Sequence, residues 1–208
     1  MAHLRIGVLA SGKGSNFGAI LSNIKSGNLD ASIQVVISNK ATAGVLEIAR
    51  QNGIPDIFVS KKEYPEQEKF DERLLSVLMN YDVNFVVLAG YLKMLSPFIV
   101  RKFKNKILNI HPALLPSFGG KGMYGIHVHQ AVLEYGCKVS GVTVHLVDEE
   151  YDTGPPVLQR CVAVENDDTP ETLAQRVLKV EHKIYTEALQ LFTQDRIEIK
   201  GRMVKIKS

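Results

Sequence analysis

Short apolar runs that alternate with amphipathic segments constrain this chain more than any other feature. In the first half, Leu4–Ala10, Ser32–Ser38 and Val83–Ala89 are rich in Val, Ile and Leu, and each is long enough for one strand. Between them lie segments with apolar residues at helical spacing, such as Asn16–Ser26 and Pro65–Tyr81. Successive strand–helix units of this kind require parallel strands with helices on both faces. We therefore predict an α/β, Rossmann-like fold with a mostly parallel, twisted sheet.

The pattern changes after a further short strand predicted at Ile107–Ile110. Val139–Val147 alternates as a strand does, and Val157–Val164 follows closely enough to pair with it. Pro170–Phe192 has the periodicity of a long helix, and Arg196–Ile206 that of a hairpin. We expect antiparallel strands in this C-terminal part of the sheet.

The length and composition favour one globular domain. The chain has 208 residues, of which 45% are hydrophobic and 23% charged, and no Pro/Gly/Ser-rich linker divides it. We expect a single domain over residues 1–208, made of two halves, 1–105 and 106–192, and a terminal hairpin, 193–208.

The charge balance bears on the kinds of partner. The chain has 25 basic and 22 acidic side chains, and its net charge of +3 gives no electrostatic case for binding nucleic acid. No apolar run approaches the roughly 18–20 residues that cross a bilayer, so we expect no membrane partner. The two cysteines, Cys137 and Cys161, cannot make a disulfide framework, which favours a cytoplasmic location.

A glycine-rich turn follows the first predicted strand. Gly12 and Gly14 allow a tight turn, and Ser15 and Asn16 open the next helix, whose N-terminus attracts anions. A phosphate site is the functional interpretation, and a plain turn with Ser or Asn capping the helix is the alternative.

The remaining motifs count against NAD and against a metal, whereas Lys40 could accept the extra phosphate of NADP, so that alternative stays open. The dinucleotide fingerprint requires a third glycine where Phe17 stands and an acidic residue where Ser38–Lys40 ends the second strand. His127 and His129 point about 200° apart on a helix, and the Cys or Glu ligands of a closed zinc set are missing. We expect no metal.

Two side chains at the end of one strand have chemistry suited to acyl transfer. Asn109 and His111 are two residues apart, so both face the same side of the predicted strand. An amide can stabilise an oxyanion while an imidazole moves protons. Asp152, in a turn between two strands, would hold His111 charged if the two side chains met. A structural histidine and an ordinary turn aspartate are the alternatives.

Four motifs occur in order along the chain: Gly12–Asn16, Val86–Leu95, Asn109–Pro116 and Asp152–Pro155. Together they resemble the pattern of the phosphoribosylglycinamide formyltransferases, a folate-dependent family within the formyltransferase superfamily. The likeness covers nearly the whole chain, and it implies the formyltransferase fold. It assigns phosphate binding to residues 1–105, and catalysis and folate binding to residues 106–192.

The resemblance implies a role for each matching residue. The catalytic trio is Asn109, His111 and Asp152. Residues implied to bind 5-phosphoribosylglycinamide (GAR) are Gly14, Ser15, Asn16, Gly90, Ile110, Pro112 and Glu181. Residues implied to bind 10-formyltetrahydrofolate are Leu92, Lys93, Met94, Leu95, Asn109, Val147, Glu149 and Asp152. A polar pair beside the catalytic aspartate is Thr143 and His145.

The reaction that the resemblance implies is direct formyl transfer in purine biosynthesis. The amine of GAR attacks the formyl carbon of 10-formyltetrahydrofolate, and Asn109 with protonated His111 stabilises the tetrahedral oxyanion. Asp152 raises the pKa of His111, a water carries the amine proton to N10, and no metal takes part. The protein is expected to act as a monomer or a homodimer.

Three alternatives remain. A formyltetrahydrofolate hydrolase and a methionyl-tRNA formyltransferase share the superfamily, but we expect the first to carry an extra N-terminal domain and the second a basic C-terminal one. A non-catalytic nucleotide-binding module would not need the trio. The glycine-rich stretch Ser117–Gly125 is longer than in many members of the family, and Leu178 and Gln67 depart from its pattern near the sugar and at a position that is often basic.

Overall fold

The computed structural model describes residues 3–207 and contains a seven-stranded sheet. The strand order is β3-β2-β1-β4-β5-β6-β7, with parallel pairing from β3 to β5 and antiparallel pairing of β6 with both of its neighbours. The expected parallel sheet with antiparallel strands in its C-terminal part is confirmed. The strands are β1 (Leu4–Ala10), β2 (Ala31–Ser38), β3 (Asp56–Phe58), β4 (Phe85–Leu88), β5 (Ile107–His111), β6 (Val139–Leu146) and β7 (Pro156–Ala163).

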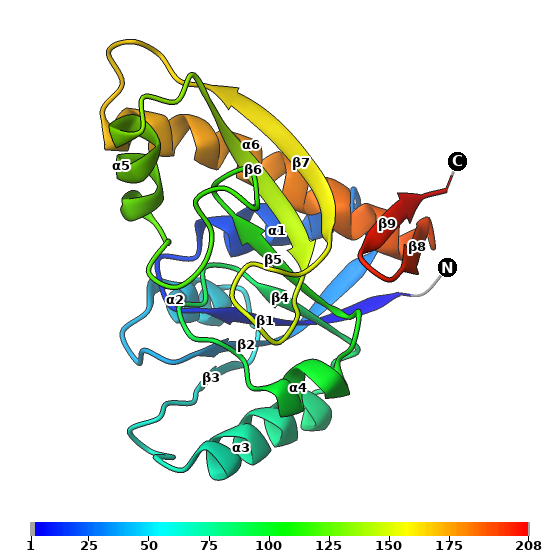
Figure 1. The fold of residues 1–208 in the computed structure, drawn as a ribbon. Coiled ribbons are helices and arrows are strands. Elements are labelled where there is room, and N and C mark those ends of the chain that lie inside the picture. Colours follow the sequence, from blue (N-terminus) through cyan, green and yellow to red (C-terminus); the bar gives the residue numbers. More distant parts are fainter. Residues whose placement is uncertain (1–2, 208) are drawn as a thin grey trace.

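Helices cover both faces of this sheet, as expected (Figure 1). On one face the core includes Phe17 of α1, Val45 of α2, Val132 of α5 and Val177 of α6. On the other face α3 and α4 pack over a second core. The helices are α1 (Ser15–Lys25), α2 (Gly44–Gln51), α3 (Gln67–Asn80), α4 (Pro97–Lys102), α5 (Ile126–Glu134) and α6 (Pro170–Thr193).

The long helix α6 is tied to the centre of the sheet by one buried hydroxyl. Thr169 caps the helix and Pro170 opens it, as the sequence Thr-Pro favours. Four turns later, the hydroxyl of the fully buried Tyr185 lies 3.0 Å from the carbonyl oxygen of Leu88 and 2.9 Å from that of Leu108. These carbonyls stand near the carboxyl ends of β4 and β5, so α6 fixes the strand ends at which ligands bind in sheets of this kind.

The C-terminal hairpin forms a separate two-stranded sheet, as predicted. Its strands are β8 (Ile197–Lys200) and β9 (Met203–Ile206), which pair antiparallel. Within residues 3–207, no helix combines the length and the apolar character needed to cross a membrane.

Candidate active site

The end of β5 brings Asn109 and His111 to one cavity. β5 lies between the parallel β4 and the antiparallel β6, so the direction of pairing changes at this strand. Asn109 and His111 both line a cavity of about 450 Å³ beyond its carboxyl end. We call it the strand-end cavity. Alternation along a strand accounts for their common side, as the sequence predicted.

Asp152 reaches the same cavity from the turn between β6 and β7. It has a positive φ of 55°, and the turn lies so close to β6 that a Cβ on Gly154 would meet the carbonyl oxygen of Leu146 at 1.8 Å. Only glycine fits there. The turn places Oδ2 of Asp152 3.6 Å from Nδ1 of His111, and Oδ1 of Asp152 3.5 Å from Nδ2 of Asn109. The three side chains therefore lie together, although Asp152 is 41 residues beyond His111.

Burial and Asp152 act in opposite directions on the pKa of His111. Its side chain is 4% exposed, and burial lowers its pKa below the ordinary value of 6.5 although Asp152 raises it and a hydrogen bond to Phe118 favours the charged ring. Loss of solvation therefore outweighs the effect of Asp152, which by itself raises the pKa of His111 as expected. Nε2 lies 2.8 Å from the carbonyl oxygen of Phe118, which can only accept, so Nε2 carries the proton of the neutral ring and Nδ1 is free of one.

Asp152 remains ionised in the same surroundings. Burial alone would raise its pKa, but the neighbouring His145, the charge that His111 can carry and the N–H of Gly120 together hold the pKa below its usual value. The Gly120 N–H donates to Oδ2 of Asp152 at 2.9 Å.

The glycine-rich stretch 117–125 is therefore part of the site, which the sequence did not show. Phe118 and Gly120 bind His111 and Asp152 through backbone atoms, and Lys121–Gly125 lines the strand-end cavity. Backbone contacts do not depend on residue type, so only the length of this stretch and its number of glycines marked it as unusual.

The two residues of the expected polar pair do different things. His145 of β6 lies beside the trio, with Nε2 3.7 Å from Oδ1 of Asp152 and 3.0 Å from Nδ2 of Asn109. The hydroxyl of Thr143 instead donates to the carbonyl of Ala113 at 2.7 Å and accepts from the N–H of Leu115 at 3.0 Å. Thr143 thus holds the segment after Pro112 rather than the aspartate.

The glycine-rich turn after β1 opens α1 at the edge of the strand-end cavity. Gly14 has a φ of 85° and Ser15 is the first residue of the helix. Asn16 lines the cavity, and its Nδ2 donates to Oε2 of Glu181 at 2.6 Å. Burial raises the pKa of Glu181, against the effect of that hydrogen bond. Gly14 and Ser15 are not among the cavity's lining residues; the other expected GAR contacts that line it are Gly90, Ile110, Pro112 and Glu181.

A second, smaller recess adjoins the first between the segment after β4 and the turn after β6. Four residues that the resemblance assigns to folate binding line it: Lys93, Met94, Leu95 and Val147. Two expectations differ: Leu92 lines the strand-end cavity instead, and Glu149 is not among the lining residues of the recess.

The carboxylate of Glu149 is engaged elsewhere. It forms a bidentate ion pair with Arg101, at 2.7 and 3.1 Å. Its neighbours Asp148 and Glu150 line the recess in its place, and the sequence did not distinguish among these three acidic residues.

The two hollows share one border. Tyr91, Asn109, Tyr151 and Asp152 line both of them. Tyr91 had no assigned role from the sequence; burial, with the nearby charge of Asp71, raises its pKa to about 12, so its hydroxyl stays protonated.

Within residues 3–207 no group of three or more His, Cys, Asp or Glu side chains could hold a metal ion.

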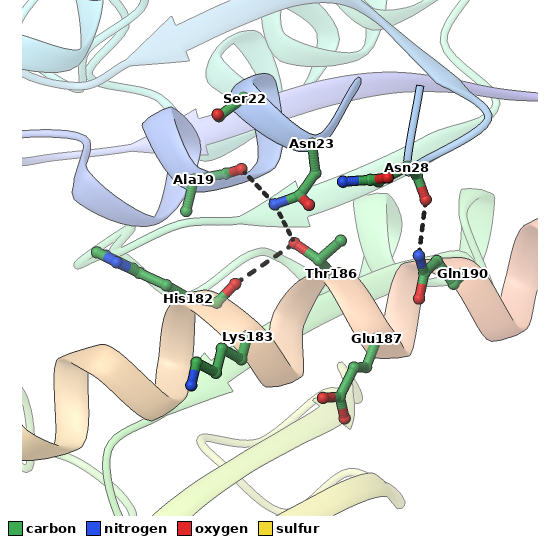
Figure 2. Close-up of a pocket in the computed structure, with 9 residues that line it drawn as sticks. All are labelled: Ala19, Ser22, Asn23, Asn28, His182, Lys183, Thr186, Glu187 and Gln190. Carbon is green, nitrogen blue, oxygen red and sulfur yellow. Dashed lines mark hydrogen bonds between the residues drawn. The ribbon is translucent and has the colours of Figure 1, made fainter. Parts of the chain in front are cut away.

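Another cavity lies apart from this site. It has a volume of about 470 Å³ and lies between α1 and α6 (Figure 2). There Asn23 donates to the carbonyl oxygen of Ala19 and to the hydroxyl of Thr186, and Gln190 donates to the carbonyl of Asn28. None of the expected site residues lines it.

Comparison with known proteins decides the family. Residues 4–189 match the model of the family described as formyl transferase. The chain belongs to the formyl transferase family. This formyl transferase is 47% identical over 195 residues to the chloroplastic phosphoribosylglycinamide formyltransferase of Arabidopsis thaliana, covering 93% of this chain and 67% of that protein. It is 37% identical to the phosphoribosylglycinamide formyltransferase of Bacillus subtilis (strain 168), covering 89% and 93% of the two chains.

The similarity also extends to a longer protein and to solved structures. The formyl transferase is 41% identical to the human trifunctional purine biosynthetic protein adenosine-3, but it spans only 19% of that protein's length. The crystal structure of glycinamide ribonucleotide transformylase 1 from Symbiobacterium toebii superposes with a TM-score of 0.93 at 42% identity, covering 99% and 95% of the two chains.

Proposed function

We propose that this chain transfers the formyl group of 10-formyltetrahydrofolate to the amine of GAR, a step of purine biosynthesis. One observation carries the proposal. Asn109 and Asp152 stand on the border of two adjoining hollows, with His111 3.6 Å from Asp152, so groups suited to acyl transfer face the place where two ligands would meet. The names of the Arabidopsis and Bacillus relatives support the same activity.

GAR occupies the strand-end cavity in this proposal. The N-terminus of α1 supplies N–H groups and partial positive charge for its phosphate, with Gly14, Ser15 and Asn16 at the turn. Glu181 lines the same cavity and accepts hydrogen bonds from sugar hydroxyls. The amine then extends past Gly90, Ile110 and Pro112 towards the trio.

The folate co-substrate fits the second recess. Met94, Leu95 and Val147 give apolar walls for a flat ring, and the carboxylates of Asp148 and Glu150 can accept from ring N–H groups. Lys93 stands at the same recess, where it can interact with an anionic part of the molecule. No metal is required.

The trio moves protons and stabilises charge. As the amine attacks the formyl carbon, its proton passes through water to the unprotonated Nδ1 of His111, and from there to N10 as the old C–N bond breaks. The charged His111 and the amide of Asn109 stabilise the oxyanion, and Asp152 stabilises the imidazolium. An oxyanion beside His111 raises the pKa of the ring and opposes the effect of burial. The ring therefore becomes charged as the oxyanion forms.

The test is incubation with 10-formyltetrahydrofolate with and without GAR, following release of tetrahydrofolate. Release only when GAR is present supports transfer, and release in its absence would show a hydrolase. The incubation without GAR is included because a formyltetrahydrofolate deformylase from Pseudomonas syringae pv. tomato str. DC3000 superposes with a TM-score of 0.89 at 26% identity. No release in either arm, with both ligands bound, would favour a non-catalytic binding module.

The proposal extends to the setting of the protein. All the proposed contacts come from one chain, so the site can work in a monomer or in a homodimer. We propose a cytoplasmic location, although the Arabidopsis relative is named as chloroplastic. Small molecules are the proposed partners, without nucleic acid or membrane.

A further inference from the structure

The tautomer of His145 follows from a single hydrogen bond. Nδ1 of His145 lies 2.9 Å from the carbonyl oxygen of Leu146. A carbonyl oxygen can only accept, so Nδ1 carries the proton. In the neutral ring Nε2 then has no proton, and it acts as an acceptor.

This acceptor fixes the direction of the Asn109 amide. Nδ2 of Asn109 lies 3.0 Å from Nε2 of His145 and 3.5 Å from Oδ1 of Asp152. Both neighbours accept, and an amide nitrogen has two hydrogens, so both hydrogens are directed at these two atoms. The amide oxygen is the polar atom of Asn109 that remains for the cavities that it lines.

That orientation suits one half of the reaction and opposes the other. An amide oxygen can accept from the N–H of an attacking amine, but it repels an oxyanion. To stabilise the oxyanion, the amide of Asn109 must turn over and present its NH₂ group. Its oxygen then faces Nε2 of His145, and two acceptors in contact are unfavourable unless Nε2 gains a proton.

We propose that His145 is a positioning residue that sets the orientation of the Asn109 amide. With Nε2 unprotonated, Asn109 presents its oxygen; with Nε2 protonated, His145 donates to that oxygen and Asn109 presents its NH₂ group to the oxyanion. The proton comes from water and returns to it, and Nδ1 keeps its bond to Leu146 throughout. This inference rests on the proposed function for its catalytic meaning, but the two orientations do not depend on turnover.

Charged groups surround Nε2 of His145. Oδ1 of Asp152 lies 3.7 Å from it. The other titratable groups that line the same recess are Tyr91, Lys93, Asp148, Glu150 and Tyr151.

The direct test is nitrogen NMR of the ¹⁵N-labelled histidine rings, with His145→Gln used to assign the signals. In the free protein we expect the neutral ring of His145 to carry its proton on Nδ1 and none on Nε2. With GAR and a folate analogue that mimics the tetrahedral oxyanion, we expect both nitrogens to be protonated. A proton on Nε2 alone in the free protein, or an unprotonated Nε2 in that complex, would overturn the proposal.

Two substitutions separate positioning from mere structural support. The Gln side chain in His145→Gln has both a donor and an acceptor, so it can pair with the oxygen or with the NH₂ group of Asn109 without gaining a proton. We therefore expect kcat to stay within about tenfold of that of the parent enzyme. In His145→Leu, kcat should fall about 10²–10³-fold, with KM for both substrates within about threefold.

The outcomes of this pair are decisive in either direction. If His145→Leu keeps the parental kcat, the proposal is wrong. It is equally wrong if folded His145→Gln is no more active than His145→Leu. Failure of the parent enzyme to transfer formyl groups would refute the proposed function instead, and the NMR result would still decide the orientation of Asn109.

Discussion

One carboxylate oxygen joins two parts of the site: Oδ2 of Asp152 lies 3.6 Å from Nδ1 of His111 and accepts the N–H of Gly120 at 2.9 Å. The carboxylate is thereby held in place by the backbone of the 117–125 stretch while it faces the imidazole. Its charge is what opposes the effect of burial on His111.

Replacing Asp152 with Asn should move the pH profile as well as the rate. Burial lowers the pKa of His111 and Asp152 raises it, so removing the carboxylate lowers the pKa further below 6.5. The proposed mechanism needs an unprotonated His111 in the free enzyme, so kcat/KM falls at acid pH, and this fall should shift to lower pH in Asp152→Asn. We expect kcat to drop about 10²–10³-fold because the imidazolium loses its partner. Steady-state rates across the pH range, with an NMR titration of His111, measure both effects.

A matched control is Glu187→Gln. It removes an exposed carboxylate of α6 that is paired with Arg160 of β7. Its rate and pH profile should equal those of the parent. If the fall of kcat/KM at acid pH occurs at the same pH in Asp152→Asn as in the parent, or at a higher pH, the assigned role of the carboxylate is contradicted.

Replacing Gly154 with Ala should displace the turn that carries Asp152. The added Cβ would lie 1.8 Å from the carbonyl oxygen of Leu146 and 2.8 Å from its carbon, so backbone must move. We expect a loss of about 1–3 kcal/mol in the free energy of unfolding, as for other overpacked sites, and a lower kcat. Urea unfolding and steady-state kinetics measure the two changes.

Gly18→Ala is the control, since a Cβ there meets nothing within 4 Å and the residue lies inside α1. It should be neutral or stabilising, because Ala favours a helix over Gly by about 1 kcal/mol. Parental stability and activity in Gly154→Ala would show that the turn is not held against β6 as described.

The fold was largely predictable because the signal for each central element is local. Leu4–Ala10 and the helix after it follow from apolar spacing and from the glycines between them, and the structure places β1 at the same residues. Boundaries differ where a side chain replaces a strand hydrogen bond. The predicted strand Val83–Ala89 is shortened to Phe85–Leu88, and just before it the side chain of Asn84 accepts the N–H of Arg5.

The site was predictable only where chemistry depends on residue type. Asn109 and His111 share a strand, so alternation placed them together, whereas the approach of Asp152 depends on a turn whose position is set by packing against β6. The backbone contacts of Phe118 and Gly120 leave no signal in the residue types. The pKa of His111 depends on how deeply the folded chain buries its side chain, and the residues next to it in the sequence do not indicate this.

The glycine-rich turn should control binding of the phosphorylated substrate. Asn16 bonds to Glu181 at 2.6 Å inside the strand-end cavity, so Asn16→Ala removes a cavity group and leaves a buried carboxyl without its donor. We expect KM for GAR to rise about tenfold, equivalent to one lost hydrogen bond, with KM for the folate substrate unchanged. Ser15→Ala should raise KM for GAR in the same sense. Equal increases in both KM values would place the phosphate elsewhere.

Removing the hydroxyl of Tyr185 should destabilise the whole domain. In Tyr185→Phe the carbonyl oxygens of Leu88 and Leu108 lose a buried donor at 3.0 and 2.9 Å, and no water replaces it in a fully buried position. Losing one buried hydrogen bond costs about 0.5–1.5 kcal/mol in the free energy of unfolding. Urea unfolding should show a lower midpoint with an unchanged slope. Tyr135→Phe is the matched control, because that side chain is 81% exposed and keeps its ring contact with Phe118. Equal stability of the two variants would mean that α6 is held to the strand ends by apolar packing alone.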